Sequence, residues 1–236
     1  MVTPPRFELE GKPGQTQRQV IEVMNAENQA ATYQMRTADW SFGTDEVVKL
    51  SEALAPGSCR PWVAIERRDV IVGAGARYRY RFEVTPPAEA KGECRFAIVL
   101  TGGADAVNAG ANIKIPINGQ IAVIVYVTME GAAPALEVLG SSVVERQGRK
   151  VPVIRVRNTG DAHTRLEGFL KGTDPGGKRI EFTPSGVPIL PGETRDVAID
   201  VAAEGDSRPE ISYPIVISGT LEWSGKTTPF EARFAP

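Results

Sequence analysis

Glycine and proline are spread so densely along this chain that long helices cannot fit between them. The 236 residues include 24 glycines and 18 prolines, about one such residue in every six, and both residue types interrupt helices. The segments between them are strand-sized, and many alternate apolar and polar side chains with the period of two that a half-buried β-strand shows. The sequence therefore predicts an all-β protein with many turns.

An internal repeat divides the chain into two similar halves. Residues 20–33 read VIEVMNAENQAATY, and residues 153–166 read VIRVRNTGDAHTRL. In each segment a β-branched strand ends in an asparagine, Asn25 or Asn158, and a polar turn and a second strand follow. Asparagine suits the end of a strand because it tolerates left-handed backbone and its amide bonds to nearby backbone groups.

A second pair of segments supports the repeat. Residues 74–84 (AGARYRYRFEV) and 191–201 (PGETRDVAIDV) both place a glycine before an alternating strand. The offset between the halves is smaller for this pair, which predicts a longer loop in the first half, at residues 39–57. We expect this loop to contain a short helical turn from Thr44 to Leu54.

Turn signals separate about seven strand-sized segments in each half. Seven short antiparallel strands in about 100 residues is the pattern of the immunoglobulin-like sandwich. We therefore predict two immunoglobulin-like β-sandwich domains in tandem, residues 1–130 and 131–236, joined at the small, proline-ended segment 131–134. The predicted strands are 5–10, 17–25, 30–38, 61–72, 76–84, 93–101 and 113–128 in the first half, and 135–144, 151–158, 164–171, 178–183, 194–201, 212–223 and 227–235 in the second.

Composition argues against several classes of function. The 27 basic and 29 acidic residues give a net charge of -2, so the basic excess of a typical nucleic-acid-binding protein is missing and we expect no nucleic-acid partner. The single histidine, His163, argues against histidine-based metal sites and against hydrolases with a histidine base. The chain also has no run of 18 apolar residues, so no membrane span is predicted. We assign no catalytic residue, no metal and no cofactor.

The predicted strand at residues 113–128 (IKIPINGQIAVIVYVT) differs from its neighbours. Its first part is apolar on one face and its second part on both faces. Pro116 lacks an N–H group, which places the first part at a sheet edge. Two interpretations remain open: the isoleucines of the first part lie on an edge that a partner completes by adding a strand, or they face the core of their own domain. These isoleucines are Ile113, Ile115 and Ile117.

The cysteines and one arginine stripe each leave two interpretations open. Cys59 and Cys94 lie too far apart for a C-x-x-C site, so they are two buried thiols or one disulfide formed in an oxidising compartment. Arg77, Arg79 and Arg81 share one face of a predicted strand. That stripe is a patch for an acidic partner or a solvated outer face that discourages unwanted sheet pairing.

Five segments, in this order along the chain, resemble those of the PapD-like periplasmic chaperones, which assemble surface pili together with an outer-membrane usher. The resemblance covers essentially all 236 residues as an order of features. The segments are Arg6 to Gly11 (RFELEG), Val20 to Asn25, Phe82 to Pro87 (FEVTPP), the loop and strand at 102–128, and Val156 to Gly160 followed by Asp161 and His163.

The resemblance implies a periplasmic chaperone that acts without ATP or a cofactor. A pilus subunit lacks its last strand, and the chaperone completes that fold with its own long strand and delivers the subunit to the usher. Export would mean that a signal peptide has been removed, and self-association could cover the exposed strand. The alternative is an exported adhesion or scaffold module with the same fold and no chaperone activity. The subunit-binding residues implied are Ile113, Ile115, Ile117, Ile121, Val123 and Val125.

The resemblance also implies an anchor for the carboxyl terminus of the subunit. The family uses an arginine on the first strand and a lysine on the long strand, and Arg6 matches the arginine. A guanidinium group suits this role because it binds a carboxylate through two hydrogen bonds. The lysine has no counterpart at residues 122–126, and Lys114 lies too early. Disulfides in exported family members imply that Cys59 and Cys94 are paired.

Overall fold

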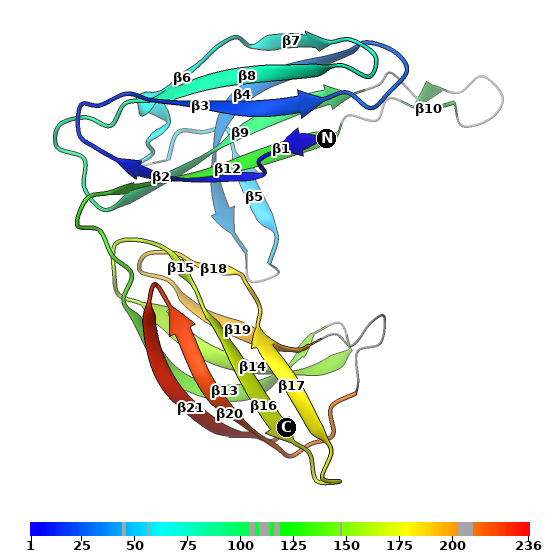
Figure 1. Cartoon of the computed structure of the whole chain (residues 1–236), viewed down its shortest axis with the longest axis vertical. Coiled ribbons are helices and arrows are strands. Elements are labelled where there is room, and N and C mark those ends of the chain that lie inside the picture. The colour runs from blue at the N-terminus through cyan, green and yellow to red at the C-terminus, as the bar shows by residue number, and fades with distance from the viewer. Residues whose placement is uncertain are drawn as a thin grey trace. The chain divides into compact units, whose positions relative to one another are not determined.

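The chain folds into two compact units, Met1–Gly131 and Ala132–Pro236, both built from β-strands (Figure 1). The computed structural model describes residues 1–43, 46–55, 57–103, 107–108, 114–115, 119–146, 148–202 and 210–236. The predicted class, all-β with two immunoglobulin-like sandwiches, is confirmed. Within the described ranges, no helix has the length and apolar character to cross a membrane.

Domain 1, residues 1–131, is a sandwich of two sheets. The first sheet has the order β1-β3-β8-β6, and the second has the order β2-β12-β9-β4-β5, with β7 paired to β4. Its core lies between the sheets and includes the fully buried side chains of Tyr80, Phe82, Phe96 and Ile98. The elements are β1 (Val2–Thr3), β2 (Arg6–Gly11), β3 (Gln17–Met24), β4 (Ala31–Phe42), β5 (Val48–Ser51), the 3-10 helix η1 (Arg60–Trp62), β6 (Val63–Ile65), β7 (Asp69–Val72), β8 (Arg77–Val84), β9 (Glu93–Gly103), β10 (Val107–Asn108), β11 (Lys114–Ile115) and β12 (Gln120–Met129).

The predicted helical turn between Thr44 and Leu54 is wrong. The chain forms the edge strand β5 instead, which pairs antiparallel with the end of β4. The last part of β4, beyond its pairing with β9 at Ala38, needs a partner for its backbone groups. The β-branched Val48 suits a strand that supplies this pairing, and the tertiary requirement overrides a weak local helix preference.

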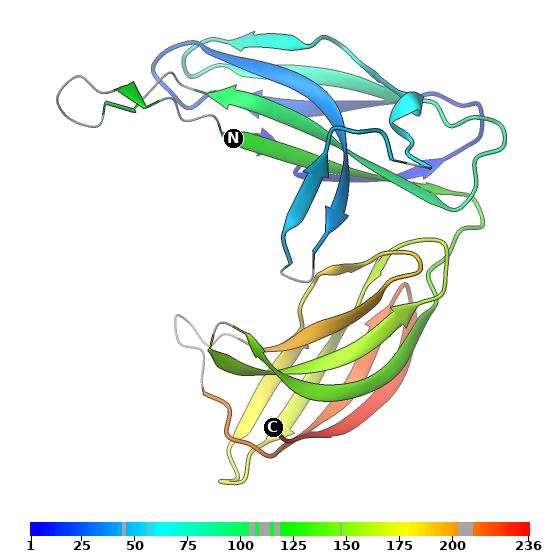
Figure 2. The same ribbon diagram turned by 180° about the vertical axis from the view of Figure 1, so that it is seen from behind.

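Domain 2, residues 132–236, also forms two packed layers, as the view from behind shows (Figure 2). Its main strand order is β13-β14-β19-β17-β16-β20-β21. Strand β19 links the layers because it pairs first with β14 and then with β17. The strands are β13 (Leu136–Arg146), β14 (Arg149–Asn158), β15 (Thr164–Arg165), β16 (Glu167–Thr173), β17 (Arg179–Pro184), β18 (Pro188–Ile189), β19 (Thr194–Val201), β20 (Ile215–Trp223) and β21 (Lys226–Phe234).

In domain 1, the first asparagine of the internal repeat is buried and joins three segments. Its Nδ2 donates to the carbonyl oxygens of Gln29 at 2.7 Å, Val72 at 3.0 Å and Gly73 at 3.1 Å. Its Oδ1 accepts the backbone N–H of Glu27 at 3.1 Å. Asn25 therefore satisfies backbone groups of two loops at the end of strand β3.

In domain 2, the second asparagine of the repeat makes the same kind of hydrogen bonds to backbone groups. Asn158 is fully buried, and its Nδ2 donates to the carbonyl oxygens of Ala162 at 2.8 Å and Ile189 at 3.0 Å. Its Oδ1 accepts the backbone N–H groups of Ala135 at 3.1 Å and Gly160 at 3.0 Å. The sequence repeat is thus a repeat of one structural device, a buried amide that ties neighbouring loops to a strand end.

We predict that Asn158→Ala lowers the free energy of unfolding by about 2–4 kcal/mol, because it leaves several buried backbone groups without partners. Urea denaturation of the whole chain, followed by the transition of domain 2, measures this change. The exposed Asn28 is the matched control, and Asn28→Ala should change stability by less than about 0.5 kcal/mol. Equal effects of the two substitutions would contradict the assigned role.

Candidate functional site

The predicted long strand is divided in the structure. Strand β12 begins at Gln120, and the two-residue strand β11 precedes it. The backbone of Ile115 lies in β11 opposite Val107 of β10. Ile113, Ile117 and the side chain of Ile115 lie outside the described residues, so their part in binding stays a prediction.

Strand β12 contributes mainly to the core of domain 1. Val123 and Val125 are fully buried because alternate side chains of β12 point between the two sheets. These two side chains are therefore not available to a partner while the domain is folded, which corrects their placement in the subunit-binding set. Ile121 is 44% exposed and remains accessible.

One edge of β12 is only partly paired. On its β9 side, β12 is paired from Gln120 onwards. On its other side, the parallel pairing with β2 begins only at Ile124, which lies opposite Arg6. Within the described part of the chain, the β12 edge from Gln120 to Val123 therefore has no strand beside it, and its backbone groups are open to a partner.

The N-terminal segment explains why this edge is open. Strand β1 pairs with β3 in the first sheet, whereas β2 pairs with β12 in the second sheet. The chain crosses from one sheet to the other at Pro4 and Pro5, which carry no N–H group for a ladder. The carbonyl oxygen of Pro5 accepts the N–H of Ile124 at 3.2 Å, and this bond marks the start of the pairing with β2.

Arg6 lies where the open edge ends. It faces the outer side of the second sheet, in one row with Ile124 of β12 and Ala97 of β9. Its Nε lies 2.9 Å from Oε1 of Glu8, and both side chains are about half exposed. An exposed pair of this kind contributes at most about 1 kcal/mol, so a carboxylate from a partner can replace Glu8 beside Arg6.

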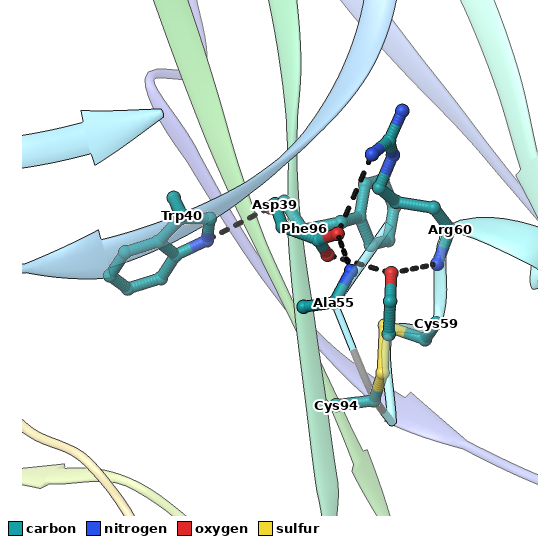
Figure 3. The surroundings of a disulfide bond; sticks show 8 residues. Asp39, Trp40, Ala55, Cys59, Arg60, Cys94 and Phe96 are labelled. Carbon is teal, nitrogen blue, oxygen red and sulfur yellow. Dashed lines mark hydrogen bonds and ion pairs between the residues drawn. A yellow bond between two sulfur atoms is a disulfide. The ribbon is translucent and has the colours of Figure 1, made fainter. Parts of the chain in front are cut away.

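Arg95 lies on the same outer face. It is opposite Tyr126 in the β9–β12 pairing, and its guanidinium carbon is 5.4 Å from the centre of the Trp40 ring. The Trp40 and Tyr126 rings meet edge to face at 5.6 Å, and Trp40 Nε1 donates to the carbonyl oxygen of Phe96 at 3.2 Å (Figure 3). Arg95 Nε is buried without a hydrogen-bond partner among the described residues. The stacking on Trp40 thus holds the Arg95 guanidinium group in place, and its Nε is a hydrogen-bond donor without a partner among the described residues.

A disulfide braces the second sheet from the core side. Cys59 and Cys94 are bonded, as the resemblance implied. Beside them, the buried carboxylate of Asp39 accepts the N–H of Ala55 at 2.9 Å and lies 3.5 Å from Nη1 of Arg60 (Figure 3). This network ties the loop before η1 to β4 and leaves β9, which carries Arg95, anchored at its start.

The arginine stripe on β8 is largely neutralised. Arg77 pairs with Glu22 at 3.2 Å and Arg81 with Glu66 at 3.8 Å, which favours the solvated outer face over a patch for an acidic partner. The carboxylate of Glu66 also accepts the hydroxyl of Tyr78 at 2.7 Å. This hydrogen bond is the main cause that lowers the pKa of Glu66 and raises the pKa of Tyr78.

No group of three metal-ligating side chains occurs within the described ranges of the chain.

The sequence identified only one of the two arginines on the outer face, Arg6 and Arg95. Arg6 followed from the resemblance, whereas Arg95 was missed. Its only signal was its position between the core-facing Cys94 and Phe96, which places it on the opposite face of β9.

Comparison with known proteins gives matches in structure only. No protein-family model and no curated protein sequence matches the chain. Similar solved structures include a chain of a chaperone–tip adhesin complex described for CFA/I fimbriae biogenesis, with 15% identity, a TM-score of 0.54, and coverage of 100% of this chain and 98% of that chain. A second is the class 5 fimbriae chaperone CfaA, with 12% identity, a TM-score of 0.54, and coverage of 100% and 99%.

A third similar structure is the CsuC–CsuE chaperone–tip adhesion subunit pre-assembly complex from the archaic chaperone–usher Csu pili of Acinetobacter baumannii. It shows 14% identity, a TM-score of 0.52, and coverage of 100% of this chain and 99% of that chain. The resemblance to the PapD-like pilus chaperones is therefore confirmed at the level of the fold, and it extends over both domains.

We predict that Glu66→Gln lowers the free energy of unfolding by about 1–2 kcal/mol at pH 7, because a hydrogen bond to a charged acceptor becomes a neutral one. The pKa of Glu66 is lower in the folded protein than its ordinary value of 4.5. Its stabilisation is therefore present above that ordinary value and is lost as the pH falls through the folded pKa.

The measurement is urea denaturation of the wild type and the variant between pH 7 and pH 3. The difference should stay constant down to about pH 5 and then shrink. Glu181→Gln, in a pair with both side chains more than 70% exposed, serves as the control with little effect. A difference for Glu66 that persists unchanged at pH 3 would argue against this role.

Proposed function

We propose that this protein is a periplasmic chaperone that captures pilus subunits by offering them the edge of a β-strand. The observation that carries the proposal is the open edge of β12 from Gln120 to Val123, which ends beside Arg6. The full-length structural likeness to fimbrial chaperones supports it. The similar structures include a chaperone–tip adhesion subunit complex and a SafA pilin in complex with the SafB chaperone.

Strand addition explains how capture proceeds without an external energy source. A subunit that lacks a strand exposes a hydrophobic groove, and the edge of β12 supplies the missing backbone hydrogen bonds. Alternating apolar side chains then fill pockets of the groove. Ile121 is available for this contact, and the proposal keeps Ile113, Ile115 and Ile117 as the further contacts on the N-terminal side of β12.

The geometry favours a subunit strand that runs parallel to β12. Such a strand would lie in line with β2, which is itself parallel to β12. Its carboxyl end would arrive at Ile124, where Arg6 begins β2. A terminal carboxylate is thus brought to a guanidinium group, which binds it bidentately.

Arg95 takes the place of the missing lysine in this proposal. It lies on the same sheet face as Arg6, on the strand next to β12, and a planar guanidinium group binds a carboxylate bidentately. The captured subunit would then pass to an outer-membrane usher. The Cys59–Cys94 disulfide agrees with an oxidising compartment such as the periplasm.

The first test replaces the apolar side chains of the offered strand. Ile115→Asp and Ile117→Asp should reduce recovery of a co-expressed candidate pilin at least tenfold, because burying a charge in an apolar pocket costs several kcal/mol. Ile71→Asp is the matched control, since Ile71 is 71% exposed on β7. Unchanged capture in the Ile115 and Ile117 variants would favour an exported immunoglobulin-like module without chaperone activity.

The second test concerns the carboxylate anchor. Arg6→Gln and Arg95→Gln should each weaken capture of a pilin with a free carboxyl terminus by about 10- to 100-fold, the value of a hydrogen bond to a charged group. A pilin with a C-terminal hexahistidine extension should lose this dependence. Arg79→Gln, on the exposed face of the other sheet, is the control. Unchanged capture with an intact circular dichroism spectrum would remove the substituted arginine from the site.

A further inference from the structure

A cleft in domain 2 lies apart from the site of the proposed function. Its volume is about 710 Å³, within the range of pockets that bind small molecules. Its walls come from the start of β14, the end of β19 and the segment 210–213 that precedes β20. Nothing in the proposed capture of pilus subunits requires this cleft.

The cleft opens because two neighbouring strands separate. Strand β19 pairs with β14 from Thr194 to Ala198. It then leaves β14 and pairs with β17 from Ile199 to Val201. Within the described residues, the first part of β14 consequently has no strand on its β19 side. The cleft therefore has backbone along one wall that is not covered by a neighbouring strand, as at a sheet edge.

Side-chain and backbone polar groups meet at this wall. The carbonyl oxygen of Lys150 accepts the hydroxyl of Tyr213 at 3.1 Å, which shows that this carbonyl points into the cleft. Burial raises the pKa of Tyr213, so the hydroxyl stays protonated and remains a donor. Val151, Ile199 and Ile211 supply an apolar lining between the polar ends.

The two sides of the cleft carry opposite charges. Arg149 and Lys150 stand on the β14 side, and Asp200 and Glu210 stand on the other. None of these four side chains forms an ion pair with another among the described residues. The cleft thus has an uncovered strand wall, an apolar lining and two sides of opposite charge. An extended peptide fits these features, because its backbone can pair with the strand and its side chains can supply apolar groups and both charges.

We propose that this cleft is a second binding site, which takes a short extended peptide segment in which a basic and an acidic residue are adjacent and have an apolar residue on each side. Neighbouring side chains of an extended chain point to opposite sides, so the two charges can face the two walls. The acidic side chain lies against Arg149 and Lys150, and the basic side chain lies against Asp200 and Glu210. The apolar residues that flank the charged pair pack on Val151 and Ile211.

The test uses the full-length protein labelled with 15N and the blocked hexapeptide acetyl-Thr-Val-Lys-Glu-Val-Thr-amide. Binding should shift the amide signals of Lys150, Val151, Val201 and Ile211 in a saturable way. An analogue with glutamine in place of both charged residues should bind about 5- to 10-fold more weakly, as expected when exposed charge pairs are lost. A smaller loss, about 2- to 5-fold, is expected for each of the Lys150→Gln and Asp200→Asn variants with the charged peptide, because each variant removes one of the charge contacts.

Lys178→Gln, in an exposed turn of the same domain, is the matched control and should bind like the wild type. Absence of shifts at the cleft, or equal binding of the charged and neutral peptides, would overturn the proposal. Because the probe has no terminal carboxylate and the signals followed belong to the cleft, the result does not depend on Arg6, Arg95 or the edge of β12. Pilin capture could therefore fail while the cleft binds the peptide, or the reverse.

Discussion

The N-terminal chain crosses from one sheet of domain 1 to the other, and this crossing decides where along strand β12 the pairing with β2 begins. Strand β1 completes the first sheet, and β2 reaches the second sheet only at Ile124. Among the described residues, the part of β12 from Gln120 to Val123 therefore has no strand on the side of β2, and this part ends beside the guanidinium group of Arg6. Exposed edges of this kind usually carry a cost because they invite aggregation, and the proposed capture of a subunit would cover this one.

The remainder of domain 1 keeps this edge rigid. The core-facing side chains of β12, including Val123 and Val125, are fully buried, so the strand cannot slide without exposing them. The disulfide and the buried Asp39 fix the loop before η1 to the same sheet. A prearranged strand loses little conformational entropy when a partner binds, which is the advantage of offering an edge from a packed sheet.

The sequence pattern predicted most strands because alternation of apolar and polar side chains is a local signal. It also located Asn25 and Asn158, since the amide of an asparagine at the end of a strand bonds to nearby backbone groups. It failed for β5, where pairing with β4 overrode local preference. It also failed for Arg95, because an arginine on an alternating strand looks the same whether its face is solvated or part of a site.

The amino-acid sequence by itself determined the all-β class, the repeated sandwich and the position of an unusual strand, because all three follow from spacing along the chain. The tertiary structure decided which side chains of that strand are exposed. Val123 and Ile121 are similar residues two positions apart, yet one is buried and the other is 44% exposed. Both side chains lie on the core-facing side of β12, but only Val123 belongs to the packed core of domain 1, and packing between distant segments is not written in local periodicity.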